Sequence, residues 1–244
     1  MSTLLLRLAG PMQSWGTDSR FDIRFTGREP SKSGVIGVLC AALGKPRQER
    51  PGDGFPSLTS LSRLKLGVRV DQPGRLQVDY QTAGGSHRTG DRYGVINATG
   101  NAWSTVQSRR YYLADADFLV GLEGDEALLR TLDAAVAAPV WQLSLGRKAF
   151  VPGDPVRLPD AGPDSEWWQM GLATALGLES GTTGYPWRAR YPGDARPERL
   201  HAVLDSEAAP RAELRQDVPL DFATRRFGVR YVTAHVRPWP EGGE

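Results

Sequence analysis

The beginning of the chain constrains the fold most strongly. Residues 4–9 form an almost continuous apolar run that ends at Gly10-Pro11. A short apolar run closed by a turn dipeptide predicts a buried central strand. After a polar loop, the apolar residues 35–43 predict a helix, and Gly44 is a suitable left-handed cap for its last turn. The chain therefore opens with a strand, a loop and a helix.

Cations and hydroxyl groups surround the predicted start of this helix. Free backbone N–H groups and the helix dipole favour an anion at such an end, and phosphate is the natural candidate. From the residues alone, the alternative is a solvated loop in which Trp15 fills the core, and we expect Trp15 itself to be structural. The residues that would hold the sugar-phosphate are Gln13, Arg24, Arg28, Ser31, Lys32 and Ser33.

The charge composition narrows the classes of function. The formal net charge is only +2, which argues against a histone-like polycation. The cations are mostly arginines, because only positions 32, 45, 65 and 148 are lysines. Arginine is the better bidentate partner for phosphate and also stacks on bases. A GC-rich genome is the simpler explanation of this bias.

A disulfide framework and a cysteine-based zinc site are excluded, because Cys40 is the single cysteine. It lies on the apolar face of the predicted helix, so we expect a small buried hydrophobe. The histidines show no metal-ligand spacing, and no cofactor or metal is expected. The leading apolar run is too short for a signal peptide and no segment predicts a membrane span, so we expect a cytoplasmic protein without a membrane partner.

The composition changes over residues 81–108. Glycines alternate there with histidine, arginine and aromatic residues, and aliphatic side chains are few. Such a segment cannot build a core, which predicts a long exposed hairpin or arm. It contains His87, Arg88 and Tyr93, the one cluster of types suited to metal-independent cleavage of RNA.

A second strand and helix follow the arm. Residues 111–122 predict a strand, and residues 127–137 predict an amphipathic helix that begins after Gly124-Asp125. A small-residue turn with adjacent cations comes after this helix, where backbone can approach a phosphate closely. The candidate phosphate ligands in this turn are Gly146, Arg147 and Lys148.

Two further pairs of cations are candidates, and the resemblance described below implies that their ligand is RNA. Arg109 and Arg110 begin a predicted strand, so their side chains point to opposite faces and at most one faces RNA from the sheet. Arg225 and Arg226 either contact RNA or guard the edge of a sheet against pairing.

The order of these elements predicts an α+β fold. We expect a ferredoxin-like (RRM-like) core over residues 1–150, with the arm at about 81–108 as a protruding β-hairpin. Residues 151–244 are expected to form a small, mostly β extension packed on the core. Its signals are weak: a helix over 167–176, a strand over 200–204 and a basic strand over 225–232.

The first segments also resemble a known family. Residues 5–16 (Leu-Leu-Arg-Leu-Ala-Gly-Pro-Met-Gln-Ser-Trp-Gly) and 26–37 are similar to the start of the CasD family, the type I-E CRISPR Cascade subunits that hold the 5′ handle of the guide RNA. Looser similarity extends to residues 108–118, 145–148 and 223–226. The residues within 81–108 and 151–220 are not recognisably similar.

The resemblance implies a function and partners. It implies a repeat-associated RNA-binding fold whose hairpin is a thumb, and a non-catalytic subunit that clasps the crRNA 5′ handle and caps the Cascade backbone in antiviral defence. The implied neighbours are the Cascade large subunit and the first backbone subunit, with target DNA met only indirectly.

Two alternatives stay open at this point. One is a metal-independent endoribonuclease that processes CRISPR repeat RNA. Cleavage of that RNA in the presence of EDTA would identify such an enzyme, provided that His87→Ala abolishes the cleavage. The other is a scaffold whose neighbours make all the RNA contacts, which crosslinking of the handle to this chain would exclude.

Overall fold

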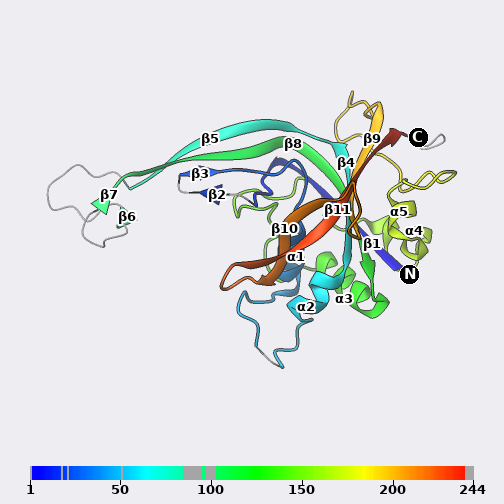
Figure 1. Ribbon diagram of the computed structural model, residues 1–244, viewed down its shortest axis with the longest axis horizontal. Helices are drawn as coiled ribbons and strands as arrows, with labels where there is room; N and C mark the ends of the chain where they lie inside the picture. The colour runs from blue at the N-terminus through cyan, green and yellow to red at the C-terminus, as the bar shows by residue number, and fades with distance from the viewer. Residues whose placement is uncertain are drawn as a thin grey trace.

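One long strand organises the molecule. β8 (Val106–Gly124) pairs antiparallel along its second half with β1 (Ser2–Gln13) on one side and with β4 (Lys65–Gln72) on the other. Its first half pairs with β5 (Arg75–Ala83) and leaves the body as a two-stranded arm (Figure 1). The computed structural model describes residues 2–17, 19–20, 22–50, 52–84, 95–96 and 103–239.

The other strands extend this sheet in both directions. β9 (Arg199–Ser206), β11 (Arg226–Pro238) and β10 (Glu213–Asp221) follow beyond β4. The short strands β3 (Ile23–Arg24) and β2 (Ser19–Arg20) lie beside the arm, where β3 runs parallel to β8. β6 (Val95–Ile96) and β7 (Trp103–Ser104) pair with each other. The sheet curls into a half-barrel, so that β10 contacts helices α1 and α2.

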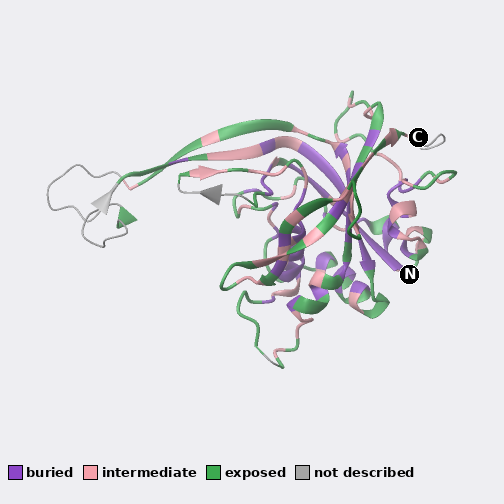
Figure 2. Cartoon of the chain, in the orientation of Figure 1, coloured by how far each residue is buried: buried purple, intermediate pink, exposed green. Residues whose placement is uncertain are grey.

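Helices cover both faces of the sheet. α1 (Lys32–Leu43), α2 (Leu58–Arg63) and α3 (Glu126–Ala137) lie on one face, over the core that contains Leu6 and Phe118. A 3₁₀ turn (Pro159–Ala161), α4 (Glu166–Gln169) and α5 (Leu172–Ala175) follow. Alternation along the strands sends Leu5 and Leu119 to the opposite face, where they meet α5 in a second core. Figure 2 shows the buried residues in the body and the exposed ones along the arm.

Two glycines in the central strands allow the close approach of α5. A Cβ on Gly67 would lie 2.5 Å from Leu176 Cδ1, and one on Gly121 would lie 2.4 Å from Leu172 Cδ1. Side chains at either position would push α5 off the sheet. These glycines are therefore explained by packing between β4, β8 and α5.

The predicted opening of the chain is confirmed in outline. The strand over 4–9 lies within β1, the helix over 35–43 lies within α1, and Gly44 ends the helix at φ +72°. However, β1 does not stop at Gly10-Pro11 but continues to Gln13. The ladder tolerates Pro11 because its opposite position, Asp115, has a left-handed conformation (φ +56°) and forms no pair with it.

The later predictions need more correction. The strand over 111–122 and the helix over 127–137 are confirmed as parts of β8 and α3, and the strand over 200–204 is part of β9. The single helix expected over 167–176 is wrong: Met170 and Gly171 are extended and divide it into α4 and α5. The basic strand begins at Arg226, since Arg225 is a left-handed turn residue.

The predicted arm is present but begins earlier. β5 starts at Arg75, before the composition changes at residue 81. Much of the expected tip, residues 85–94 and 97–102, lies outside the described residues. The division of the chain at residue 150 stays a prediction, although β9, β11 and β10 continue the same sheet as β4.

A buried ionic cluster ties the last strands to the first helix. The backbone N–H of Lys32 donates to Asp217 Oδ2 at 2.8 Å, and its ammonium donates to Asp205 Oδ2 at 2.8 Å. Arg230 donates through Nε to Asp217 Oδ1 at 2.6 Å and also pairs with Asp205. Burial acts to raise the pKa of Asp217, but hydrogen bonds from Arg230 and Lys32 outweigh it and hold that pKa below its ordinary value.

We expect Asp217→Ala to destabilise the fold. It would leave Arg230 and the first amide of α1 without their shared acceptor, and breaking a buried pair in this way costs about 3–5 kcal/mol. Urea unfolding measures the loss. Glu207→Ala is the control, because Glu207 is exposed, and it should change stability by less than about 0.5 kcal/mol. Equal effects of the two substitutions would contradict the role of the cluster.

We also expect the lowered pKa of Asp217 to appear in the acid stability. A carboxyl whose folded pKa is depressed contributes its full stability above the unfolded pKa of about 3.9 and loses it as the pH falls through the folded pKa. The free energy of unfolding should therefore decline below about pH 4. Asp217→Asn should show a shallower decline in the same titration, and an unchanged slope would be the contrary result.

Candidate nucleic-acid interface

The turn of residues 144–148, which we call the cationic turn, is held by backbone hydrogen bonds. The N–H of Leu145 donates to the carbonyl of Phe150 at 2.7 Å, and the N–H of Phe150 donates to the carbonyl of Arg147 at 2.9 Å. Ser14, at the end of β1, donates its N–H to the carbonyl of Leu145 at 3.0 Å. Because Leu145 and Phe150 are buried in the core, the turn is fixed on the body at the base of the arm.

The packing of the turn against the end of β1, rather than a ligand, requires a glycine at position 146. Its φ is +94°, and a Cβ there would lie 1.8 Å from the backbone carbonyl oxygen of Ser14. We expected this glycine to admit a phosphate. The backbone that approaches it closely is that of the end of β1, whereas its contact with a phosphate stays a prediction.

Arg147 lies where three segments of the chain that carry cations meet. Its Nη2 donates to the carbonyls of Arg24 at 3.2 Å and of Tyr111 at 2.9 Å, and its guanidinium lies 5.4 Å from the centre of the Phe150 ring. Burial, followed by the charge of Arg110, lowers the pKa of Arg147, and Arg24 adds to the effect. We call Arg24, Arg110 and Arg147 the arginine cluster.

The arginine cluster retains an excess of positive charge. Asp79 on β5 lies opposite Arg110 in the register, and it is the nearby carboxylate that favours the charged form of Arg147. No ion pair joins Arg24, Arg110 or Arg147 to a carboxylate in the part of the chain that the structure describes. An anion that approached would relieve the repulsion among three guanidinium groups.

On its other side the cationic turn borders a groove along α1, which we call the α1 groove. It has a volume of about 700 Å³. Three cations line it, Lys45, Arg47 and Lys148, and its described lining contains no carboxylate. Lys45 is itself paired with Glu49 at 3.1 Å, so Arg47 and Lys148 carry the free charge. The remaining lining residues are Ser33, Gly34, Gly37, Val38, Cys40, Ala41, Pro46, Trp141, Gln142, Ser144, Gly146 and Phe222.

Groups of the protein itself occupy the start of α1. The carboxylate of Asp217 already accepts the N–H of Lys32, and the Ser31 hydroxyl accepts the N–H of Gly34 at 3.2 Å. The Lys32 ammonium is buried and paired with Asp205. The anion that the helix end favours is thus supplied by the protein, and Ser31 and Lys32 are structural.

Gln13 is also structural. Its side chain is 0% exposed, and its Nε2 donates to the carbonyls of Leu8 and Ala116 at 2.9 and 2.7 Å. Its Oε1 accepts the indole N–H of Trp15 at 3.1 Å. Trp15 is buried in the core, which confirms the structural role expected for it.

The other predicted contacts divide between several surfaces. Ser33 lines the α1 groove. Arg109 is exposed and Arg110 half-buried, and they pair with Tyr80 and Asp79 on β5, so they lie on opposite faces of the arm as expected. Arg225 and Arg226 are exposed at the turn between β10 and β11. The interpretation of Arg225 and Arg226 stays open.

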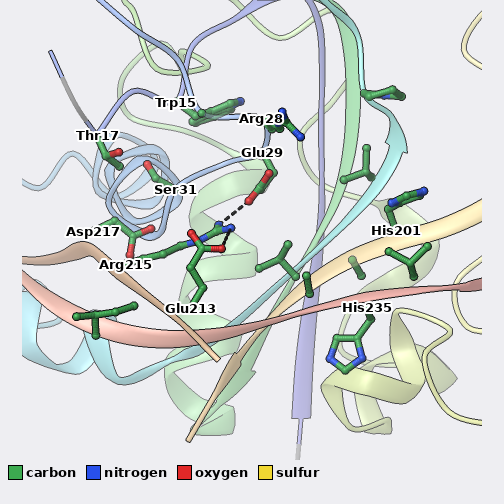
Figure 3. Close-up of a pocket in the computed structure, with 18 of the residues that line it drawn as sticks. Trp15, Thr17, Arg28, Glu29, Ser31, His201, Glu213, Arg215, Asp217 and His235 are labelled. Carbon is green, nitrogen blue, oxygen red and sulfur yellow. Dashed lines mark hydrogen bonds and ion pairs between the residues drawn. The ribbon is translucent and has the colours of Figure 1, made fainter. Parts of the chain in front are cut away.

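Arg28 lines a larger cavity, of about 910 Å³, on the inner side of the curled sheet. Figure 3 shows that Arg215 in this cavity is paired with two carboxylates, those of Glu29 and Glu213. Arg215 donates to Glu29 at 2.5 Å and to Glu213 at 3.2 Å. A cavity with paired charges of both signs offers a polyanion less than the acid-free α1 groove does.

Two contributors to the surface were missed from the sequence. Trp141 lines the α1 groove with 47% of its surface exposed, and Phe25 stacks on Tyr111 with ring centres 5.4 Å apart. Apolar residues in weakly patterned segments are normally expected to be buried, so nothing local marked them. The cluster His87, Arg88 and Tyr93 lies outside the described residues.

Among the residues that the structure describes, no group of histidine, cysteine and acidic side chains could hold a metal ion. Within the same residues, no helix combines the length and apolar character needed to cross a membrane.

Comparisons with known proteins agree on one family. The family model described as "CRISPR-associated protein (Cas_Cas5)" matches residues 3–233. A curated relative, the CRISPR system Cascade subunit CasD of Escherichia coli (strain K12), is 36% identical over 160 residues, which cover 61% of this chain and 66% of the relative. The match thus spans just under two thirds of that relative's length.

Solved structures extend the similarity to nearly the whole chain. A structure titled "Crystal structure of Cas protein" is 40% identical, with a TM-score of 0.71 over 99% of this chain and 100% of the other. A chain from a "CRISPR RNA-guided surveillance complex" is 34% identical, with a TM-score of 0.74 over 99% and 92%.

We expect Gly146→Ala to disturb the cationic turn. The added methyl group would meet the Ser14 carbonyl in a backbone conformation that costs a non-glycine residue about 1–3 kcal/mol before the clash is counted. Gly37→Ala is the matched control, because a Cβ at this position inside α1 would meet no atom within 4 Å apart from the adjoining backbone of its own helix. That control should raise stability by about 0.5–1 kcal/mol. Thermal unfolding of both variants checks the difference, and a neutral Gly146→Ala would refute the account of the turn.

Proposed function

The chain belongs to the Cas5 family of CRISPR-associated proteins, and we propose that it is a non-catalytic subunit of a type I-E Cascade complex that binds the 5′ handle of crRNA. The observation that carries the proposal is the cationic turn. It separates the arginine cluster from the α1 groove, and both surfaces present cations that form no ion pair with a carboxylate among the described residues. A single strand that crossed the turn would meet positive charge on both sides.

The chemistry of this surface suits single-stranded RNA. Arginine and lysine neutralise phosphates, while exposed aromatic and polar side chains receive bases that are not paired. Arg24, Arg110 and Lys148 supply charge, and Phe25 and Trp141 supply exposed rings. A double helix would offer its phosphates but would keep its bases away from the α1 groove.

We propose that the body is a ferredoxin-like core. β8 lies between β1 and β4, and α1 and α3 pack together on one face. On the far side of β1, residue Leu6 forms an antiparallel bridge with Arg157. This bridge supplies the fourth strand position of a split βαβ arrangement, with β9, β11 and β10 added beyond β4.

We further propose that the arm is the thumb and that the partners are other Cascade subunits. The arm leaves the body beside the arginine cluster, since Arg110 belongs to both. RNA bound at the cationic turn would therefore reach the arm directly. The large subunit and the first backbone subunit would flank this end of the guide in the cytoplasm, and target DNA would be met through the guide.

We expect loss of Lys148 or Arg110 to weaken RNA binding by removing one phosphate contact each. The observed affinity for single strands falls with salt at a log–log slope of about −0.7 per phosphate contacted. Lys148→Gln and Arg110→Gln should each make that slope shallower by about 0.7. The measurement is a titration of a single-stranded RNA that carries the repeat-derived handle, between about 50 and 200 mM salt, conditions in which electrostatic binding changes strongly.

Arg199→Gln provides the control, because Arg199 is exposed at the start of β9, away from the cationic turn. It should leave the salt slope unchanged. Slopes equal to that of the unsubstituted protein in both test variants would count against this surface. Arg147 is left intact because it holds the carbonyls of Arg24 and Tyr111.

A further inference from the structure

We propose that the α1 groove is a subsite for one unstacked nucleobase of the bound RNA, which stacks on the indole of Trp141 and lies over Gly37. The inference rests on the proposed function, because the base belongs to the strand held at the cationic turn. It assigns two residues, neither of which was a candidate from the sequence. The chemical class of the occupant is a neutral heterocycle on a ribose that carries a phosphate on both sides.

Gly37 is the first observation. It lies in the middle of α1, where glycine costs about 0.5–1 kcal/mol relative to alanine. Gly34, one turn earlier, has a packing reason, because a Cβ there would meet the Trp15 ring at 2.7 Å. Gly37 has none: its Cβ would enter open space that belongs to the α1 groove. The glycine leaves the helix backbone bare where a flat ring can lie close to it.

Trp141 is the second observation. Its backbone N–H donates to the carbonyl of Ala41 at 3.1 Å, which fixes it at the end of α1 and beside the groove. Nevertheless, nearly half of its surface is exposed. No ring contact or hydrogen bond of its indole occurs among the described residues. A large ring held on a fixed backbone without a protein partner is suited to stack on an aromatic ligand, and nucleobases provide such faces.

The rest of the lining fits a nucleotide rather than an isolated apolar ligand. Arg47 and Lys148 stand near the phosphates that would flank the base, and the groove contains no carboxylate in its described lining to repel them. Gln142 and Ser144 offer hydrogen-bonding groups to the edge of a base. The larger cavity lacks this combination, because the carboxylates of Glu29, Glu213 and Asp217 line it.

The test is an abasic scan combined with substitution of Trp141. The full-length protein is titrated with the handle RNA and with versions that lack the base at one position at a time. For the unsubstituted protein, one position should stand out, with affinity lowered about 5- to 150-fold, the range found for loss of a base stacked on an aromatic side chain. For Trp141→Ala, intact RNA should bind about as weakly as that abasic RNA, and removing the same base should then have little further effect. Trp141→Phe should keep most of the affinity.

Gly37 gives an independent version of the same test. Gly37→Leu fills the open space with a side chain that helices accept, so it should lower affinity for intact RNA to the level of the abasic RNA. Gly37→Ala adds only a methyl group to the same space, so it should lower the affinity less than Gly37→Leu does. Thermal unfolding of each variant shows that the fold is intact.

The outcomes separate this inference from the proposed function. If the RNA binds with the salt slope expected for Lys148 but no abasic position is coupled to Trp141, the base subsite is refuted and the proposed function stands. If the handle RNA does not bind above unrelated single strands and Lys148→Gln has no effect, the proposed function itself fails. Coupling of one position to both Trp141 and Gly37 establishes the subsite.

Discussion

The rest of the structure depends on the buried contact between Asp217 and the first turn of α1. It joins residues 185 positions apart in the chain and fixes β10 against the helix. Because β10 is the last strand of the curled sheet, this contact closes the half-barrel and sets the orientation of α1. The side of α1 that carries Gly37 then faces residues 140–148, and the groove forms between them. The same carboxylate also satisfies the helix dipole, so no external anion is needed there.

The distribution of charge explains how a nearly neutral chain presents a cationic surface. Several arginines are used in ion pairs elsewhere in the body: Arg7 of β1 with Asp117 of β8, Arg157 with Asp133 of α3, Arg188 with Asp160 and Arg190 with Asp154. Arg69 is fully buried and pairs with Asp71 at 2.6 Å. These pairs consume acidic residues in the body, away from the cationic turn. The net charge of +2 therefore says little about the local field, which is set by the cations that form no ion pair within the described part of the chain.

The sequence predicted what depends on local pattern. The apolar run of β1, the helix α1 with its Gly44 cap, and α3 after Asp125 follow from periodicity and capping, and all were expected. The cationic turn was also found, since a glycine followed by two cations after a helix is a local signal. Its two cations have different roles, however. Arg147 holds backbone carbonyls, whereas Lys148 faces the groove, and only tertiary contacts distinguish them.

The failures arise where a distant partner decides the role of a residue. Gln13 and Lys32 look like ligands for RNA in the sequence. In the fold, however, Gln13 donates a hydrogen bond to the carbonyl of Ala116. Lys32 donates to the carboxylates of Asp205 and Asp217. Three glycines also differ in role because of partners that are distant in the sequence. Gly34 admits a tryptophan ring and Gly146 admits the backbone of Ser14, whereas Gly37 admits nothing within the described protein. Of these three glycines, two thus have a close neighbour and one has none. The glycine without a neighbour, Gly37, marks open space in the α1 groove that is available to a ligand.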